Sequence, residues 1–394
     1  MSRVVLNHIL AGVFRSNPAY ELAPFDHLSL DQQELLKELT SDPDFYGVLL
    51  PRRPGSGSIK SVCRDTALLM HTMLQAGPLP GYVERTLGER SNQAVAELVL
   101  DGILEIEHDG RFVSGAEAYP LIYASQPDPE PQGLLPILSR AALEYAQALE
   151  IDDVNRLSSR LYLFNRIPLT PHWARRLSST DAVSDFLGIS EPTNLRRIEK
   201  HWARVEPRAP YNGWFQWQSR HSSPAASNHH HGYKLYLSPQ PDSLPAAFRA
   251  VVEVLDASAA HSFKVGCDSV GLLRPDKFVL YFRDFESLEE TARELALRLS
   301  GCSAQGVPFT AAIGSDGLLS WGVDPLPEKD TLSWRGQESW RFWVTNRLAA
   351  ALVLARRAPR GTLEPWQFAL ERLRLENVDT VTWAPTRDFI YPTR

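Results

Sequence analysis

Three segments of the sequence that resemble β-strands each place one lysine among apolar residues. The segments are YKLYL, FKV and DKFVLYF, and their lysines are Lys234, Lys264 and Lys277. Alternate side chains of a strand share a face, so Tyr236 joins Lys234 on the face opposite the apolar residues. Arg274 precedes the third segment at an expected turn, next to a proline that restricts the backbone. The pattern therefore predicts several positive charges on one face of a sheet.

A converging group of lysines and arginines suits a dianionic phosphate, because arginine offers forked donors and lysine a point charge. Each neighbouring cation also disfavours protonation of a lysine and lowers its pKa. A partly neutral lysine can act as a general base, so one array could both hold a phosphate and remove a proton. The alternative is a solvated sheet face whose charges only oppose aggregation. Two further arginines, Arg335 and Arg341, lie before and within a predicted helix.

Other polar residues near these strands support additional interpretations. We expect Asp276 to fix a neighbouring cation or to cap the turn, with a catalytic carboxylate as the alternative. His261 is a second candidate for a general acid, although a surface or helix-end histidine is the simpler interpretation. The histidines of NHHHG (228–232) have no spaced carboxylate or cysteine partner, and they therefore do not predict a metal site.

The composition of the whole chain is typical of a soluble globular protein. Its 394 residues are 43% apolar and 22% charged, which allows two or three domains. The net charge of −6 argues against a general nucleic-acid-binding protein. Three cysteines without a CxxC pair favour a reducing compartment, and neither a signal peptide nor a membrane-spanning apolar run is evident. We therefore expect a cytoplasmic protein that binds neither nucleic acid nor a membrane.

Two proline-rich breaks, SQPDPEPQG at 125–133 and VEPRAPYNG at 205–213, divide the chain. We expect an N-terminal module over 1–125, a helical connector over 134–204 and a further domain over 205–394. In the first part, IKSVCRDTALLMHTML and SNQAVAELVLDGIL have helical spacing, and the DG turn of EIEHDGRFVSG indicates a hairpin. Two helices and a small hairpin predict a winged-helix-like module, for which peptide binding, DNA binding and a structural role all remain open.

Beyond residue 211, helices alternate with segments of period-2 hydrophobicity. Strands are predicted in GYKLYLSP, SFKVGCD, DKFVLYF and VPFTAAIG, and helices in LPAAFRAVVEVLDASAA and SLEETARELALRLSG. Ser287 stands three residues before Glu290, which is the spacing of a capping box at the start of a helix. This order predicts an α+β fold, in which a mixed or antiparallel sheet with flanking helices forms the C-terminal domain.

The segments YKLYLSP, FKVG, RPDKFVLYF and PFTAAIGSDGLLSWGVDP resemble the HopA-like type III effector family. The resemblance covers roughly residues 205–360, and related domains serve as lyases in class V lanthipeptide and thioamitide biosynthesis. The order of elements is also distantly similar to that of bacterial phosphothreonine lyases, which remove phosphate by β-elimination. The resemblance implies a lyase that converts phosphoserine or phosphothreonine of a precursor peptide into dehydroalanine or dehydrobutyrine.

The resemblance also assigns roles to individual residues. Lys264 follows an aromatic residue and matches the lysine that removes the α-proton, while Arg274 matches the arginine that binds phosphate. Lys234 matches a lysine two positions before a histidine general acid, but Tyr236 stands in the place of that histidine and becomes the expected acid. LSWGVDP lacks an arginine that the family pattern has, and Arg335 of the next segment is the expected substitute.

We expect four cations to hold the phosphate and to stabilise the developing charges without a metal or an organic cofactor. The residues expected to bind phosphate are Lys234, Arg274, Lys277 and Arg335. The resemblance implies a separate kinase that first phosphorylates the precursor peptide, and it favours leader-peptide binding by the N-terminal module, since docking raises the effective concentration. The alternative, from another class, is a non-catalytic phosphopeptide-binding or effector-like interaction protein that uses the same basic cleft.

Overall fold

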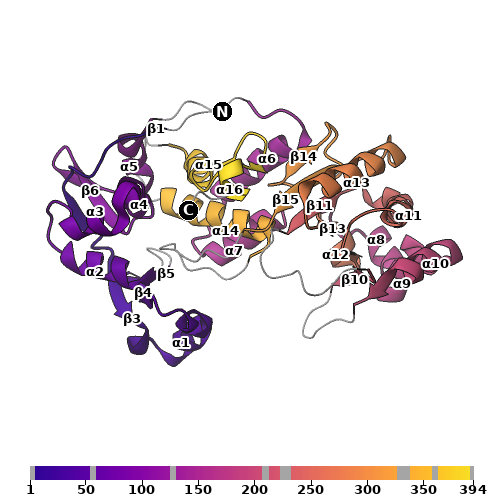
Figure 1. Cartoon of the computed structure of the whole chain (residues 1–394), viewed down its shortest axis with the longest axis horizontal. Coiled ribbons are helices and arrows are strands. Elements are labelled where there is room, and N and C mark those ends of the chain that lie inside the picture. The colour runs from indigo at the N-terminus through magenta and orange to yellow at the C-terminus, as the bar shows by residue number, and fades with distance from the viewer. Residues whose placement is uncertain are drawn as a thin grey trace.

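The structure is a computed structural model that describes residues 5–53, 59–124, 130–205, 213–221, 232–325, 338–356 and 363–390. Figure 1 shows an elongated arrangement, in which the N-terminal residues lie at one end, the largest sheet lies toward the other, and helices lie between them. Among the helices of these residues, none combines the length and the apolar character that a bilayer-spanning segment needs.

The N-terminal part contains the two helices and the hairpin predicted from the sequence. The helices are α2 (Arg64–Thr72) and α4 (Ser91–Leu100), and the hairpin pairs β6 (Leu104–His108) with β7 (Arg111–Val113). The hairpin turns at the predicted DG pair, where both residues have positive φ. Strand β2 (Phe14–Ser16) pairs with the other edge of β6. The assignment to a winged-helix fold stays a prediction.

A second small antiparallel sheet, β3-β4-β5, precedes α2 and was not predicted from the sequence. The remaining elements of this part are β1 (Val5–Leu6), β3 (Tyr20–Pro24), α1 (Leu30–Leu36), β4 (Phe45–Pro51), β5 (Lys60–Cys63), α3 (Gly81–Leu87), α5 (Gly115–Ile122) and β8 (Tyr123–Ala124).

The C-terminal half contains one seven-stranded antiparallel sheet in the order β14-β15-β11-β13-β12-β10-β9. Its strands are β9 (Trp202–Arg204), β10 (Trp214–Ser219), β11 (Tyr233–Leu237), β12 (Ser262–Gly266), β13 (Phe278–Phe282), β14 (Ala311–Ile313) and β15 (Leu319–Val323). Helices together with antiparallel sheets confirm the α+β prediction at this level.

The helices beyond the first linker surround this sheet. They are α6 (Leu134–Ala148), α7 (Val154–Tyr162), α8 (Pro171–Arg176), α9 (Thr180–Leu187), α10 (Pro192–His201), α11 (Leu244–Leu255), α12 (Ser269–Leu272), α13 (Phe285–Arg298), α14 (Trp340–Ala355) and α15 (Pro365–Leu375). Two short strands and a final short helix complete the described residues, namely β16 (Val378–Asp379), β17 (Ala384–Pro385) and α16 (Arg387–Ile390).

The two faces of the large sheet differ in polarity, as the period-2 pattern predicted. On one face, Leu235, Phe263 and Leu280 are fully buried in a core that includes apolar residues of α11 and α13. The opposite face carries the two strand lysines. Lys234 lies across from Tyr281 and Lys264 lies across from Val279, and Val279 and Tyr281 are alternate residues of β13 that share one face. Helices α7 and α14 approach this polar face.

Helices α14 and α15 follow the sheet in sequence but pack against the earlier helices. One continuous cluster of buried apolar side chains joins α4, α5, α6, α7, α14 and α15. A Cβ added at Gly115 would lie 3.3 Å from Leu354 of α14, and the Tyr119 hydroxyl donates a 2.5 Å hydrogen bond to Glu371 of α15. Residues 205–394 therefore share a core with residues that precede the proline-rich breaks.

One predicted helix cap is wrong. The N-cap of α13 is Asp284, whose carboxylate accepts a 2.8 Å hydrogen bond from the backbone N–H of Ser287. Ser287 is thus already inside the first turn rather than before it. Aspartate and serine are both good N-caps. The structure uses the earlier of the two, so the first helical residue is Phe285.

We expect Gly322→Ala to lower the stability of the protein, because α14 lies directly against this position of β15. An added Cβ would lie 2.3 Å from Cδ1 of Trp340, the first residue of α14. Overpacking of this kind costs about 1–3 kcal/mol, so the urea midpoint of unfolding should fall. Gly77→Ala is the control, since no heavy atom lies within 4 Å of its added Cβ. Equal midpoints for the two variants would contradict this packing.

Candidate active site

Three of the predicted cations converge on the polar face of the sheet around two aromatic rings. Lys234 Nζ lies 5.5 Å and Lys264 Nζ 5.6 Å from the ring centroid of Tyr281. Lys264 Nζ also lies 4.3 Å from the ring centroid of Trp214, and the same ring is 4.9 Å from Arg274 Cζ. Lys264 shares the Tyr281 ring with Lys234 and the Trp214 ring with Arg274, so it lies between these two cations. Side chains from β11, β12 and the turn before β13 thus form one cluster.

The ammonium of Lys264 differs from its neighbours in having no counter-charge of its own. Within the described residues, its Nζ forms no hydrogen bond or ion pair. Burial lowers the pKa of Lys264 to about 8, with Lys234 and Arg274 acting in the same direction and Asp276 and Asp324 opposing. At pH 7, about one Lys264 side chain in ten is then neutral, against about three in ten thousand for an ordinary lysine.

Lys234 is a buried cation that is firmly paired. Its side chain is 8% exposed, and its Nζ lies 2.6 Å from Oδ2 of Asp324. The other oxygen of Asp324 accepts a 2.8 Å hydrogen bond from the backbone N–H of Trp340, where α14 begins. The carboxylate is therefore held by both the sheet and the helix, and it fixes the position of Lys234.

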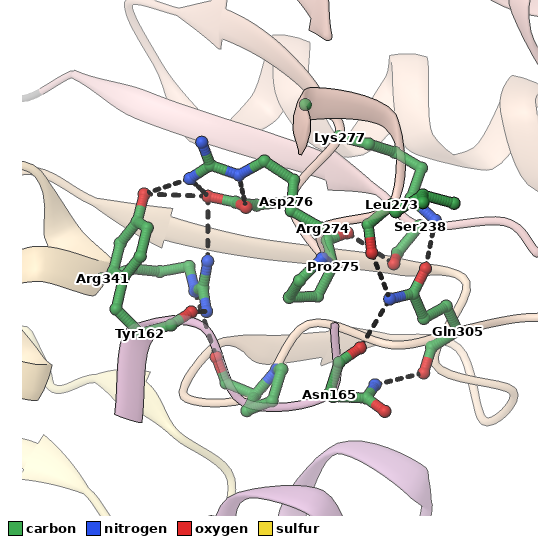
Figure 2. A network of polar contacts seen from close by, with 12 residues as sticks. Tyr162, Asn165, Ser238, Leu273, Arg274, Pro275, Asp276, Lys277, Gln305 and Arg341 are labelled. Atoms are coloured by element: carbon green, nitrogen blue, oxygen red, sulfur yellow. Dashed lines mark hydrogen bonds and ion pairs between the residues drawn. The ribbon is translucent and has the colours of Figure 1, made fainter. Parts of the chain in front are cut away.

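Arg274 belongs to a buried network centred on Asp276, which Figure 2 shows. Arg274 donates from Nε to Oδ1 of Asp276 at 2.5 Å, and from Nη2 to Oδ2 at 2.9 Å and to the Tyr162 hydroxyl at 2.7 Å. Tyr162 in turn donates to Oδ2 of Asp276 at 2.9 Å, and Arg341 Nη1 forms an ion pair with that oxygen at 2.8 Å. The prediction that Asp276 fixes a neighbouring cation is confirmed.

The carboxyl of Asp276 is a permanent anion. Burial alone would raise its pKa, but the Arg341 and Arg274 guanidiniums outweigh burial and hold the pKa well below its usual range. Arg341 itself is 1% exposed, and it also donates to the backbone oxygens of Tyr162 and Pro308. Arg341 is therefore a buried counter-charge for Asp276 rather than an accessible anion ligand.

Arg274 retains one group that can reach a ligand. Its Nε and Nη2 are engaged by Asp276 and Tyr162, whereas Nη1 has no hydrogen-bond partner within the described residues. The side chain is 17% exposed, so Nη1 can donate toward solvent or toward a bound anion.

Tyr236 lies on the same face as the lysines and keeps its proton at neutral pH. Burial raises its pKa well above the usual value, and Asp324 adds to the rise. No hydrogen bond of its hydroxyl is present within the described residues. Val279 lies across from Lys264 on one side and from Tyr236 on the other, so these two side chains flank the same valine.

One predicted phosphate ligand, Lys277, does not join the cluster. Lys277 is fully buried, and its Nζ donates to the backbone oxygen of Pro239 at 2.7 Å and to the side chain of Gln305. Burial lowers the pKa of Lys277 to about 7. Its contacts attach the loop at Gln305 to the end of β11, so its position favours a structural role. Arg335 lies outside the described residues, as do the histidines of the NHHHG run.

Sequence reasoning missed three residues that complete the site. Tyr162 ends a helix far from the strand segments, and nothing local in the sequence singles it out. Trp214 opens β10, a strand that was not predicted, and Asp324 follows β15 at its end. Strand β15 was not predicted either, and Asp324 appeared only within the segment PFTAAIGSDGLLSWGVDP, without an assigned role.

No family model matches this sequence, and no curated protein matches it. Among solved structures, the chain is similar to an effector protein from Pseudomonas syringae pv. tomato strain DC3000 at 13% identity, over 64% of this chain and 96% of that one, with a TM-score of 0.38. An effector protein from Pseudomonas syringae pv. syringae strain 61 has 14% identity, 64% and 97% coverage, and a TM-score of 0.36.

The type III effector/phosphothreonine lyase OspF from Shigella flexneri is similar at 16% identity, over 31% of this chain and 69% of that one, with a TM-score of 0.26. These neighbours are effectors and phosphothreonine lyases at low identity. Because the TM-scores are low, we base the functional proposal on the geometry of the site.

Removing the charge of Lys234 should raise the pKa of Lys264. In Lys234→Met, the repulsion between the two ammonium groups is lost and Asp324 is released, so the pKa should move from about 8 toward the ordinary value of 10.5. The pKa can be measured by competitive amine labelling across pH, with mass spectrometry of the peptide that contains Lys264. Lys200→Met on the exposed side of α10 is the control and should leave the value unchanged. A Lys264 that titrates near 10.5 in the unmodified protein would contradict the geometry.

Proposed function

We propose that this chain is a lyase that removes phosphate from phosphothreonine or phosphoserine in a peptide by β-elimination. The observation that carries the proposal is Lys264, a lysine with a pKa of about 8 and no ion-pair partner within the described residues, placed between Lys234 and Arg274. A neutral amine is a general base, and the paired cations beside it can receive an anion.

The charge balance of the cluster suits a dianion. Among the described residues, four cations face two carboxylates, which gives a net charge of +2 when Lys264 is protonated and +1 when it is neutral. The cations are Lys234, Lys264, Arg274 and Arg341, and the carboxylates are Asp276 and Asp324. A phosphate monoester in its dianionic form therefore compensates an excess of positive charge that the protein leaves in a largely buried place.

The reaction follows from these positions. The Lys264 amine takes the α-proton of the phosphorylated residue, and the electron pair forms the double bond between Cα and Cβ as the bond from Cβ to oxygen breaks. The phosphate leaves toward Lys234 and Nη1 of Arg274, and the Tyr236 hydroxyl supplies a proton to the departing oxygen. Lys234 and Arg274 carry fixed positive charge where negative charge develops, which lowers the barrier without rearrangement of the site.

The same proposal extends to the biological substrate. We take it to be a ribosomal precursor peptide, phosphorylated by a separate kinase and converted to dehydroalanine or dehydrobutyrine in lanthipeptide or thioamitide biosynthesis. The N-terminal helices and hairpin would bind the leader of that peptide, because a docked leader raises the local concentration of the phosphorylated core. The sequence segments that resemble the HopA-like family support this extension.

The direct test is incubation of the protein with a phosphothreonyl peptide. We expect release of inorganic phosphate and a product lighter than the unphosphorylated peptide by one water, while Lys264→Met should lose this activity and still bind the phosphopeptide. Lys200→Met should behave as the unmodified protein. Phosphopeptide binding without any mass change in the unmodified protein would instead support a non-catalytic phosphopeptide-binding protein.

The activity should rise with pH through about 8. The pKa of Lys264 is lowered from 10.5 to about 8, so the neutral, reactive amine is the minor form below that value and the major form above it. Measured as kcat/KM, the rate should increase about tenfold per pH unit below this midpoint and then level off. A profile that falls between pH 6 and 8 would exclude Lys264 as the base.

Tyr236→Phe should slow elimination by about 100-fold or more while leaving phosphopeptide affinity nearly unchanged, because it removes the proton donor but no charge. A peptide with a thiophosphate ester has a more acidic leaving group, so its elimination depends less on a proton from Tyr236. Tyr236→Phe should therefore lower kcat less for the thiophosphate ester than for the phosphate ester. The comparison of kcat for the two esters measures this difference. An equal defect for both esters, or no defect, would remove Tyr236 from the role of acid.

A further inference from the structure

The anion site contains one component from outside the segment that resembles the effector family. Tyr162 is the last residue of α7, in the helical layer that faces the sheet. Its hydroxyl accepts a 2.7 Å hydrogen bond from Nη2 of Arg274 and donates a 2.9 Å bond to Oδ2 of Asp276. It therefore links the anion-binding arginine to the carboxylate that holds it.

The ring of Tyr162 is fixed independently of its hydroxyl. It lies 5.3 Å from Arg274 Cζ and 4.4 Å from Arg341 Cζ, measured from the ring centroid, and it packs edge to face with Phe342 at 6.3 Å. Its backbone oxygen accepts a 2.8 Å bond from Arg341. Burial raises the pKa of Tyr162 to about 12, so the hydroxyl keeps its proton and remains a donor to Asp276 at neutral pH.

The geometry of a guanidinium turns these contacts into a constraint on the ligand. Its nitrogens lie in one plane, so fixing Nε and Nη2 also fixes the direction of Nη1. The two parallel bonds to Asp276 set the direction of the fork within its plane, but they let that plane tilt about the line through the two carboxylate oxygens. The second acceptor at Nη2, the Tyr162 hydroxyl, removes this freedom.

We propose that Tyr162 is a positioning residue. It sets the phosphate affinity of the site by holding the Arg274 guanidinium in the orientation in which Nη1 can donate to the anion. The proposal rests on the proposed function in treating phosphate as the ligand, and it concerns binding rather than the removal of the proton. It also makes the helical connector part of the anion site, because α7 supplies the contact.

The test is Tyr162→Phe, which keeps the ring and removes only the hydroxyl. Losing one hydrogen bond to a charged group should weaken binding of inorganic phosphate about tenfold, measured by calorimetry. With a phosphothreonyl peptide, KM should rise by a similar factor while kcat changes much less. Tyr119→Phe is the matched control, since it removes a buried tyrosine–carboxylate hydrogen bond to Glu371 and should leave phosphate affinity unchanged.

A double substitution tests whether the effect passes through Arg274. In an Arg274→Lys background the planar fork is absent, so Tyr162→Phe should weaken phosphate binding no further. Unchanged phosphate affinity in Tyr162→Phe, or an equal additional loss in the Arg274→Lys background, would overturn the proposal. A protein that binds phosphate, loses affinity in Tyr162→Phe and eliminates no phosphate would retain this inference and reject the lyase.

Discussion

The site depends on an unequal distribution of counter-charges among neighbouring cations. Lys234 is paired with Asp324 and Arg274 is paired with Asp276, but Lys264 between them has no carboxylate of its own within the described residues. In a partly desolvated place, the unpaired ammonium is the group that most readily gives up its proton. In the proposed chemistry, the two paired cations bind the anion and Lys264 acts as the base. The same crowding therefore accounts for both halves of the proposed chemistry.

The wider fold maintains this distribution. Each of the two carboxylates is held from the opposite layer, Asp324 by the backbone of Trp340 and Asp276 by Arg341 and Tyr162. These contacts come from the start of α14 and the end of α7. Helix α14 is buried around most of its circumference, because it packs against the sheet, α7 and α15 together. The helices of this layer thus hold both carboxylates of the site in place. Figure 1 shows the layer between the N-terminal part and the sheet.

The sequence predicted the parts of this site that depend on local periodicity. Alternation along single strands placed Lys234, Tyr236 and Lys264 on one face, and the turn before β13 supplied Arg274. Alternation also grouped Lys277 with them, although this residue lies just before β13, where its ammonium turns to a neighbouring carbonyl oxygen. A strand pattern carries no information about such end contacts.

What the sequence could not predict depends on contacts between distant segments. Tyr162 and Asp276 are separated by more than a hundred residues, and their hydrogen bond exists only because α7 packs over the sheet.

The most direct test of the central claim is the fate of the α-hydrogen. A phosphothreonyl peptide deuterated at the α-carbon can be converted by the protein and its product examined by mass spectrometry. Removal of that hydrogen by Lys264 predicts a dehydrated product without deuterium. A dephosphorylated product that keeps its deuterium, as simple hydrolysis would give, would contradict the account.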